Sequence, residues 1–191
     1  MALAPPALLL IDVQQGLDDP AWGERNNLAA EQRMAELLAT WRGALWPVLH
    51  VQHMSTQPAS PLQPGLPGNA FKPEALPLDD EPVFQKTVNS AFIGTTLEAY
   101  LHEHGIRSLV VAGLTTDHCV STTVRMAGNL GFDVVVVEDA TATFARTGHD
   151  GARHSAQQMH DLALASLHGE FATVRSTLQV IARAAADSDD E

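Results

Sequence analysis

The sequence has little of what marks a secreted or membrane protein. Cys119 is the only cysteine among 191 residues, so no internal disulfide can form and the composition fits a reducing compartment. No hydrophobic run approaches the length needed to span a membrane, and the first residues lack the basic segment of a signal peptide. We therefore expect a soluble, cytoplasmic protein.

Positive charge is scarce as well. Lysine and arginine number 11 against 23 acidic residues, which gives a net charge of -12. Nucleic acids and anionic membranes bind clusters of lysine and arginine, so neither is expected as a partner. Only two of the basic residues are lysines, Lys72 and Lys86. Lys72 lies in a polar loop, where we expect a solvated surface lysine.

The rest of the composition is that of one globular domain. Hydrophobic residues make up 45% of the chain, with 13 glycines and 11 prolines spread along it, which allows a sizeable core. We expect a single domain over residues 1–185 and a solvated acidic tail at 186–191. Residues 55–82 are rich in proline, glycine and serine and are too long for an ordinary connection. They form either a cover over a functional site or a loop that only runs over the surface.

Apolar runs alternate with amphipathic segments along the chain. Runs typical of buried strands occupy residues 7–13, 47–52, 83–86, 109–112, 134–137 and 171–174. Apolar residues at helical spacing occupy residues 28–45, 95–104, 119–130, 150–167 and 176–185. Strands that alternate with helices predict an α/β protein, in which helices cover both faces of a parallel sheet.

The single cysteine lies where a strand passes into a helix. The apolar run 109–112 ends at Gly113, a polar turn follows, and helical spacing begins at Cys119. A thiol in the first turn of a helix has its anion favoured by the helix dipole, which makes it a better nucleophile near neutral pH. The alternative is a small buried hydrophobe without chemistry, as many free cysteines are.

Two further reactive side chains, Asp12 and Lys86, also end apolar runs. The carboxyl ends of parallel strands share one edge of the sheet, where open α/β sheets bind ligands, so both can meet Cys119. Together the three permit attack by a thiolate, with the carboxylate transferring the proton and the ammonium stabilising the anions. Such a site needs no metal and no cofactor. A solvated or capping carboxylate is the alternative for Asp12.

Other polar residues lie close to these positions. Gln14 points to the same side as the acid two residues earlier if the chain remains extended. His118 precedes Cys119 and suggests a Cys–His dyad, although neighbouring side chains in a turn usually diverge. His50 and His53 lie three residues apart on one strand and so face opposite sides, which makes a metal pair of them a weak prediction.

Three segments resemble cysteine hydrolases of the isochorismatase-like superfamily, which includes nicotinamidases, N-carbamoylsarcosine amidohydrolase and related amide-cleaving enzymes. They read LLLIDVQQG around Asp12, QKTVNSAFIGTTL around Lys86 and VVAGLTTDHCVSTTVRMAGNLGFDVVVVEDA around Cys119. The resemblance covers nearly the whole chain, and these segments in this order and spacing are specific. It implies a catalytic triad of the three residues. It also implies a three-layer α/β/α sandwich with a six-stranded, mostly parallel sheet.

The resemblance implies an oxyanion site as well. A cis peptide bond between Leu114 and Thr115 would turn the backbone N–H groups of Thr115 and Cys119 toward the oxygen of a tetrahedral intermediate. The thiolate of Cys119 would attack an amide carbonyl, and Asp12 would carry the proton from the thiol to the leaving nitrogen. Water activated by Asp12 would then hydrolyse the thioester.

The sequence departs from two branches of the superfamily. Metal-dependent nicotinamidases carry an Asp-x-His arrangement and a further histidine after the second strand, where this chain reads HVQHMSTQP. Neither a nicotinamidase nor a zinc site is therefore expected. Isochorismatases proper commonly lack a cysteine at the nucleophile position, so Cys119 favours hydrolysis of a C–N bond in a small amide or ureido compound. The alternatives are vinyl-ether hydrolysis of the isochorismate type and a non-catalytic, redox-sensing relative.

Substrate specificity is expected to come from the less regular parts of the chain. The candidates for the pocket are residues 55–82 and the side chains of Gln14, Trp22, Phe92 and His118. A neighbouring subunit is a further source, since relatives of this kind assemble into dimers, tetramers or larger rings. We expect a homo-oligomer, a dimer or tetramer, that acts on a small-molecule substrate without a cofactor.

Overall fold

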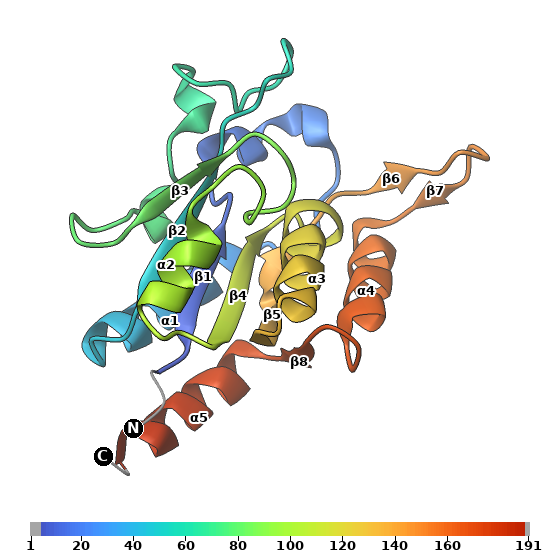
Figure 1. Ribbon diagram of the computed structural model, residues 1–191. Helices are drawn as coiled ribbons and strands as arrows, with labels where there is room; N and C mark the ends of the chain where they lie inside the picture. Colours follow the sequence, from blue (N-terminus) through green and yellow to red (C-terminus); the bar gives the residue numbers. More distant parts are fainter. Residues whose placement is uncertain (1–4, 190–191) are drawn as a thin grey trace.

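A parallel sheet runs through the centre of the computed structural model, which describes residues 5–189, with side chains to residue 186 (Figure 1). Its strands are β1 (Ala7–Ile11), β2 (Val48–His53), β3 (Val83–Lys86), β4 (Ser108–Leu114), β5 (Asp133–Ala142) and β8 (Thr173–Arg175). They lie in the order β3-β2-β1-β4-β5-β8, and every neighbouring pair is parallel. The winding reverses between β1 and β4, which is where open α/β sheets leave a crevice at the carboxyl ends of their strands.

Five α-helices of the described part cover the two faces of the sheet. They are α1 (Ala30–Gly43), α2 (Leu97–Glu103), α3 (Ser121–Asn129), α4 (Ala156–Leu167) and α5 (Thr177–Asp189). The helices α2, α3 and α4 pack on one face, and α1 and α5 on the other. Side chains alternate along β1, so Leu9 and Ile11 join the apolar cluster beneath α2, α3 and α4. Leu8 and Leu10 join the apolar cluster beneath α1 and α5. The predicted α/β/α sandwich with six parallel strands is confirmed.

The helix expected from residue 150 begins later, at Ala156. The preceding residues form a hairpin instead, in which β6 (Arg146–Thr147) pairs with β7 (Arg153–His154). Ser155 then starts the helix with a capping box. The residues that suggested a longer helix are therefore divided between a hairpin and a helix.

The last helix extends past its predicted end at residue 185, because α5 continues to Asp189. The single domain over residues 1–185 and the acidic tail at 186–191 stay predictions. Residues 190–191 of the expected tail, like residues 1–4, lie outside the described part. Within that part, none of the helices has both the length and the apolar character needed to cross a membrane.

Gly113 allows β4 to pass close to β1 as it leaves the sheet. Its φ is +128°, and a Cβ at this position would lie 2.1 Å from the carbonyl oxygen of Ile11. Any other residue would force the two strands apart. Because Leu114 and Thr115 follow directly and lead into the turn that carries Cys119, this glycine sets the position of that turn.

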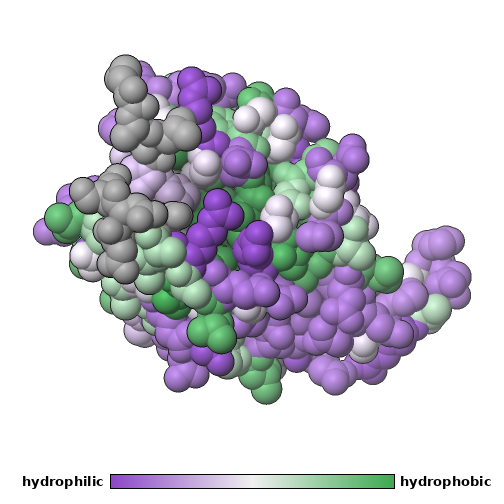
Figure 2. All heavy atoms as spheres, turned by 90° about the horizontal axis from the view of Figure 1, so that it is seen from below, coloured by the Kyte–Doolittle hydropathy of each residue, from purple (hydrophilic) through white to green (hydrophobic). Residues whose placement is uncertain are grey.

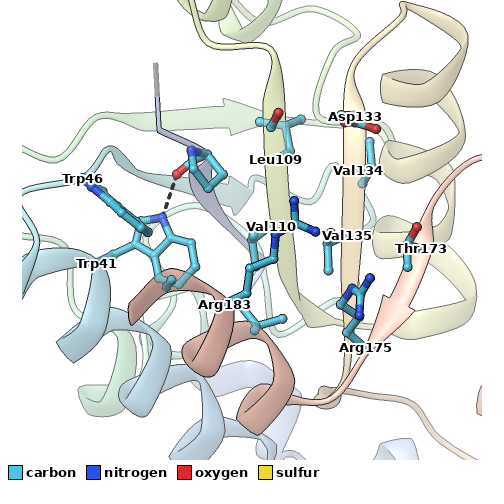
Figure 3. Close-up of a pocket in the computed structure, with 14 residues that line it drawn as sticks. Trp41, Trp46, Leu109, Val110, Asp133, Val134, Val135, Thr173, Arg175 and Arg183 are labelled. Atoms are coloured by element: carbon cyan, nitrogen blue, oxygen red, sulfur yellow. Dashed lines mark hydrogen bonds between the residues drawn. The ribbon is translucent and has the colours of Figure 1, made fainter. Parts of the chain in front are cut away.

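A pocket of about 260 Å³ lies at the amino-terminal edge of the sheet (Figure 3). Trp41 and Trp46 line it in edge-to-face contact, and the indole of Trp41 donates a hydrogen bond to the carbonyl oxygen of Pro6 at 2.8 Å. Arg175 and Arg183 also line it. Figure 2 views the molecule from this edge and shows hydrophobic surface among polar side chains. The three predicted catalytic residues lie at the opposite edge and do not reach this pocket.

Lys72 is buried, contrary to the expectation of a solvated lysine. Its ammonium lies 2.5 Å from the carboxylates of both Asp18 and Glu31. Glu31 also forms a two-bond ion pair with Arg25. Burial alone would raise the pKa of Glu31, but the hydrogen bonds from Arg25 and Lys72 lower it to about 2. The ion pair between Lys72 and Glu31 connects the loop of residues 55–82 to α1, and no sequence pattern indicates these partners of Lys72.

We expect Lys72→Met to lower the free energy of unfolding by about 3 kcal/mol, because it removes one of two partners from a largely buried carboxylate. The measurement is urea unfolding at neutral pH, followed by circular dichroism. Arg33→Met is the matched control, since its ion pair with Glu36 is exposed and pairs of that kind contribute about 0.5 kcal/mol. Equal losses in the two variants would contradict the role assigned to Lys72.

Candidate active site

Three reactive side chains meet at the carboxyl edge of the sheet. Asp12 directly follows β1, Lys86 ends β3, and Cys119 lies in the π-helical turn Thr116–Val120 after β4. The Nζ atom of Lys86 lies 2.6 Å from Oδ2 of Asp12 and 3.3 Å from Sγ of Cys119. Asp12 and Lys86 are 2% and 1% exposed. The structure thus brings together the three residues that the sequence singled out.

Lys86 is saturated with acceptors. An ammonium has three N–H donors, and a third acceptor, Nδ1 of His53, lies 3.0 Å away beside the carboxylate and the sulfur. A buried charge without a partner costs several kcal/mol. Asp12 and Lys86 are therefore tolerated as charges because each is the partner of the other.

One carboxylate oxygen of Asp12 remains open. Oδ2 accepts the hydrogen bond from Lys86, whereas Oδ1 is buried and has no partner among the residues that the structure describes. Carboxylate oxygen, imidazole nitrogen and sulfur of Asp12, His53 and Cys119 lie within 4.8 Å of one another. A fixed carboxylate with a free lone pair this close to a thiol is suited to accept the thiol proton.

The surroundings of Cys119 favour its thiol over the thiolate. Burial, and after it the charge of Asp12, raises its pKa, and the opposing effect of Lys86 is smaller. The sequence predicted an anion favoured by a helix dipole. The difference has a structural reason, because Cys119 lies in a π-helical turn and α3 begins only at Ser121. The thiolate must therefore form by transfer of its proton to a base.

Asp12 and Cys119, together with His53, line a cavity of about 510 Å³, large enough for a small molecule. The first third of the long loop forms part of its wall, through Ser55, Gln57, Ala59, Ser60, Pro61 and Leu62. Of the two alternatives for residues 55–82, the structure therefore favours a cover over the site.

The turn after β4 forms another part of the wall. Leu114 and Thr115 line the cavity beside Cys119, and the peptide bond between them is cis. The next residue, Thr116, is buried, and its hydroxyl lies 2.9 Å from Nδ1 of His160 on α4. This hydrogen bond connects the turn that carries the thiol to α4.

Two of the four pocket candidates line the cavity. Trp22 does so with its indole stacked on Phe144 at a centroid distance of 5.7 Å. His118 also lines it, but its ring faces Arg146, with Nδ1 3.3 Å from Nη2. In the described part of the chain no hydrogen bond joins His118 to Cys119, so the alternative Cys–His dyad does not form.

Gln14 and Phe92 do not line the cavity, contrary to the prediction. Gln14 is fully buried, and its side-chain amide bonds to the backbone N and O of His53 at 2.8 and 3.1 Å. The prediction assumed an extended chain, but Asp12 has a φ of +52° and breaks the alternation of side chains. Phe92 packs in the apolar cluster beneath α2 and stacks with Phe132 at 5.9 Å.

The site contains residues that the sequence did not reveal. His53 entered the predictions only as a weak metal partner of His50, and the two histidines indeed diverge, because His50 bonds to Glu81 at 2.8 Å. As the last residue of β2, His53 satisfies the same strand-end rule that identified Asp12. Asn89, whose Oδ1 lies 3.8 Å from the sulfur, carries no comparable signal.

Asp12, His53 and Cys119 form the one group in the described part whose ligand atoms lie close enough to share a metal ion. The ammonium of Lys86 is already bonded to all three. A metal cation among the same atoms would lie against a fixed positive charge. The donor set therefore fits an ammonium better than a metal ion.

The chain is similar to known proteins over most of its length. The Isochorismatase domain model matches residues 6–179. YrdC, an uncharacterized isochorismatase family protein from Bacillus subtilis, is 47% identical over 175 residues, which cover 92% of this chain and 94% of that protein. Maleamate amidohydrolase from Pseudomonas putida is 29% identical, with 91% and 85% covered. The crystal structure of an isochorismatase-family protein from Chromobacterium violaceum has a TM-score of 0.92 and 49% identity, with 95% and 94% covered.

We expect Asp12→Asn to speed the alkylation of Cys119 by iodoacetamide. Loss of the neighbouring negative charge lowers the thiol pKa, and a fall of one unit gives about ten times more thiolate at a given pH. Because Cys119 is the only cysteine, intact-protein mass spectrometry reports its labelling directly. Asp133→Asn, at the far edge of the sheet, is the charge-matched control and should react at the wild-type rate. Slower labelling of Asp12→Asn would overturn the assignment of the raised pKa to Asp12.

Proposed function

The chain belongs to the isochorismatase family of hydrolases, and on that premise we propose that it hydrolyses a C–N bond in a small amide or ureido compound through a thioester on Cys119. The observation that carries the proposal is the environment of Asp12. Its Oδ2 is bonded to Lys86, its Oδ1 is buried without a hydrogen-bond partner, and its carboxylate lies within 4.8 Å of the sulfur of Cys119. A redox sensor would need the thiol but not this paired carboxylate. The similarity to maleamate amidohydrolase supports an amide as the substrate.

The first half of the reaction makes the thioester. Sγ of Cys119 bonds to the amide carbonyl carbon while the thiol proton passes to Oδ1 of Asp12. The carbonyl oxygen becomes an oxyanion, which we assign to the backbone N–H groups of Thr115 and Cys119; such donors contribute about 3 kcal/mol each in related chemistry. The C–N bond then breaks, and the nitrogen leaves with the proton from Asp12. The ammonium of Lys86 stays charged throughout and stabilises both anions.

The second half returns the enzyme to its resting state. A water molecule enters where the nitrogen left, and Asp12 takes one of its protons as the oxygen bonds to the thioester carbon. The C–S bond breaks, the sulfur takes back a proton through Asp12, and a carboxylic acid leaves. Because the thiol pKa is raised, the thiolate exists only during these steps.

The lining of the cavity suggests the shape of the substrate. Trp22 and Leu62 contribute apolar surface to the wall of the cavity, and Arg146 contributes a positively charged group. Nε of Arg146 bonds to Asp117 at 2.6 Å, which orients the guanidinium, and its remaining N–H groups suit an acceptor such as a carboxylate. We therefore favour a small carboxamide or ureido acid. The cytoplasmic location and the homo-oligomer expected from the sequence stay predictions.

Acyl trapping tests the proposed function. We expect a panel of small amides and ureido acids, mixed with the protein in the presence of EDTA, to give a mass increase on Cys119 that equals the acyl group, together with release of ammonia. Cys119→Ala should give no adduct and lose turnover by at least about a thousandfold, with an unchanged circular dichroism spectrum.

Three results would contradict this proposal. Turnover of an amide by Cys119→Ala would remove the nucleophile. Release of pyruvate from isochorismate without any adduct on Cys119 would favour vinyl-ether hydrolysis instead. Activity lost in EDTA and restored by zinc would show that a metal takes part.

A further inference from the structure

The ring of His53 lies in the active site without a part in the steps above. Its Nδ1 is 3.0 Å from Nζ of Lys86 and 3.9 Å from Oδ2 of Asp12, and the side chain is 16% exposed where it lines the cavity. An ammonium can only donate, so Nδ1 must present a lone pair to Lys86. The ring is therefore neutral, and its single N–H is on Nε2.

The backbone of His53 is held on both sides. The amide of Gln14 accepts from His53 N and donates to His53 O, and the side chain of Asn69 donates to the same oxygen at 2.9 Å. Gln14 is fully buried and Asn69 is 7% exposed. Two buried amides thus fix the place from which the imidazole reaches Lys86.

We propose that His53 is a positioning residue for Lys86, which as a neutral imidazole takes one N–H of the ammonium and so directs the other two to Asp12 and Cys119. The effect that we assign to His53 in hydrolysis rests on the proposed function. Without an acceptor at this place, one N–H of a fully buried ammonium would lack a partner. The ammonium would then turn or shift toward Asp12 and weaken its contact with the sulfur.

Protonation of His53 would abolish this arrangement, because an N–H and a positive charge would face the ammonium. Burial, and after it Lys86, lowers the pKa of His53 from its ordinary value of 6.5, while Asp12 opposes the shift. The ring stays neutral at neutral pH, and hydrolysis should fall as the pH drops through the pKa of His53. The other charged or titratable groups that line the cavity are Asp19, His118, Cys119 and Arg146.

The first test needs no substrate. Two-bond proton–nitrogen NMR spectra, recorded over the range in which histidine titrates, about pH 5 to 8, report the tautomer and pKa of each ring, and His53→Asn identifies the signal. We expect the Nε2–H tautomer and a pKa below 6.5. In Lys86→Gln, and in the charge-balanced Asp12→Asn/Lys86→Gln variant, the pKa should rise. A proton on Nδ1, or an unchanged pKa in both variants, would overturn the proposal.

The second test is kinetic and uses the amide that the trapping experiment identifies. Asparagine places Oδ1 near the position of the histidine Nδ1 and does not titrate, whereas leucine has no acceptor. We expect His53→Leu to lower kcat by about 10- to 100-fold, and His53→Asn to keep most of kcat but lose the acidic limb of the pH profile. His102→Asn, on the exposed surface of α2, should keep the wild-type profile.

An unchanged kcat in His53→Leu, or an acidic limb that persists in His53→Asn, would refute the positioning role. If the wild-type protein hydrolyses none of the amides, the proposed function fails, and the NMR experiment alone decides whether His53 holds Lys86.

Discussion

A buried ion pair is the interaction on which the rest of the site depends. Lys86 and Asp12 lie 2.6 Å apart at 1% and 2% exposure. Neither charge would be tolerated there alone, because a buried charge without a partner costs several kcal/mol. The pair keeps a base charged within 4.8 Å of the sulfur. The chemistry proposed for Cys119 follows from that juxtaposition.

The fold explains why these groups meet. Parallel strands end at a common edge, and the reversal between β1 and β4 opens a crevice there. Asp12 and Lys86 are strand-end residues, and Gly113 brings β4 close enough to β1 for the next turn to carry Cys119 beside them. The first third of residues 55–82 then covers the crevice. Farther along the same loop, Lys72 connects it to α1 through an ion pair with Glu31.

The sequence predicts those parts of the site that depend on periodicity. Apolar runs that end in a reactive residue were enough to place Asp12, Lys86 and Cys119 at one edge, and the six-stranded sandwich followed from the same alternation together with the family resemblance. Gln14 was misplaced because a single left-handed residue, which no periodicity reveals, reverses the side on which it lies. The thiol pKa was misjudged because it depends on burial and on a charge more than a hundred residues away, not on the local turn. The sequence thus predicts residues that share a strand edge, and it misses what depends on a single backbone angle or on the burial of a side chain.

A double-mutant cycle on the buried ion pair tests the central claim most directly. The free energy of unfolding in urea is measured for the wild type, Asp12→Asn, Lys86→Met and the double variant. Because each single variant leaves one buried group without its partner, the account predicts that the double variant loses less stability than the sum of the two single losses, by about 2 kcal/mol or more. Losses that simply add would contradict it, since two residues that do not depend on each other's charge cannot hold a base and a thiol in one site.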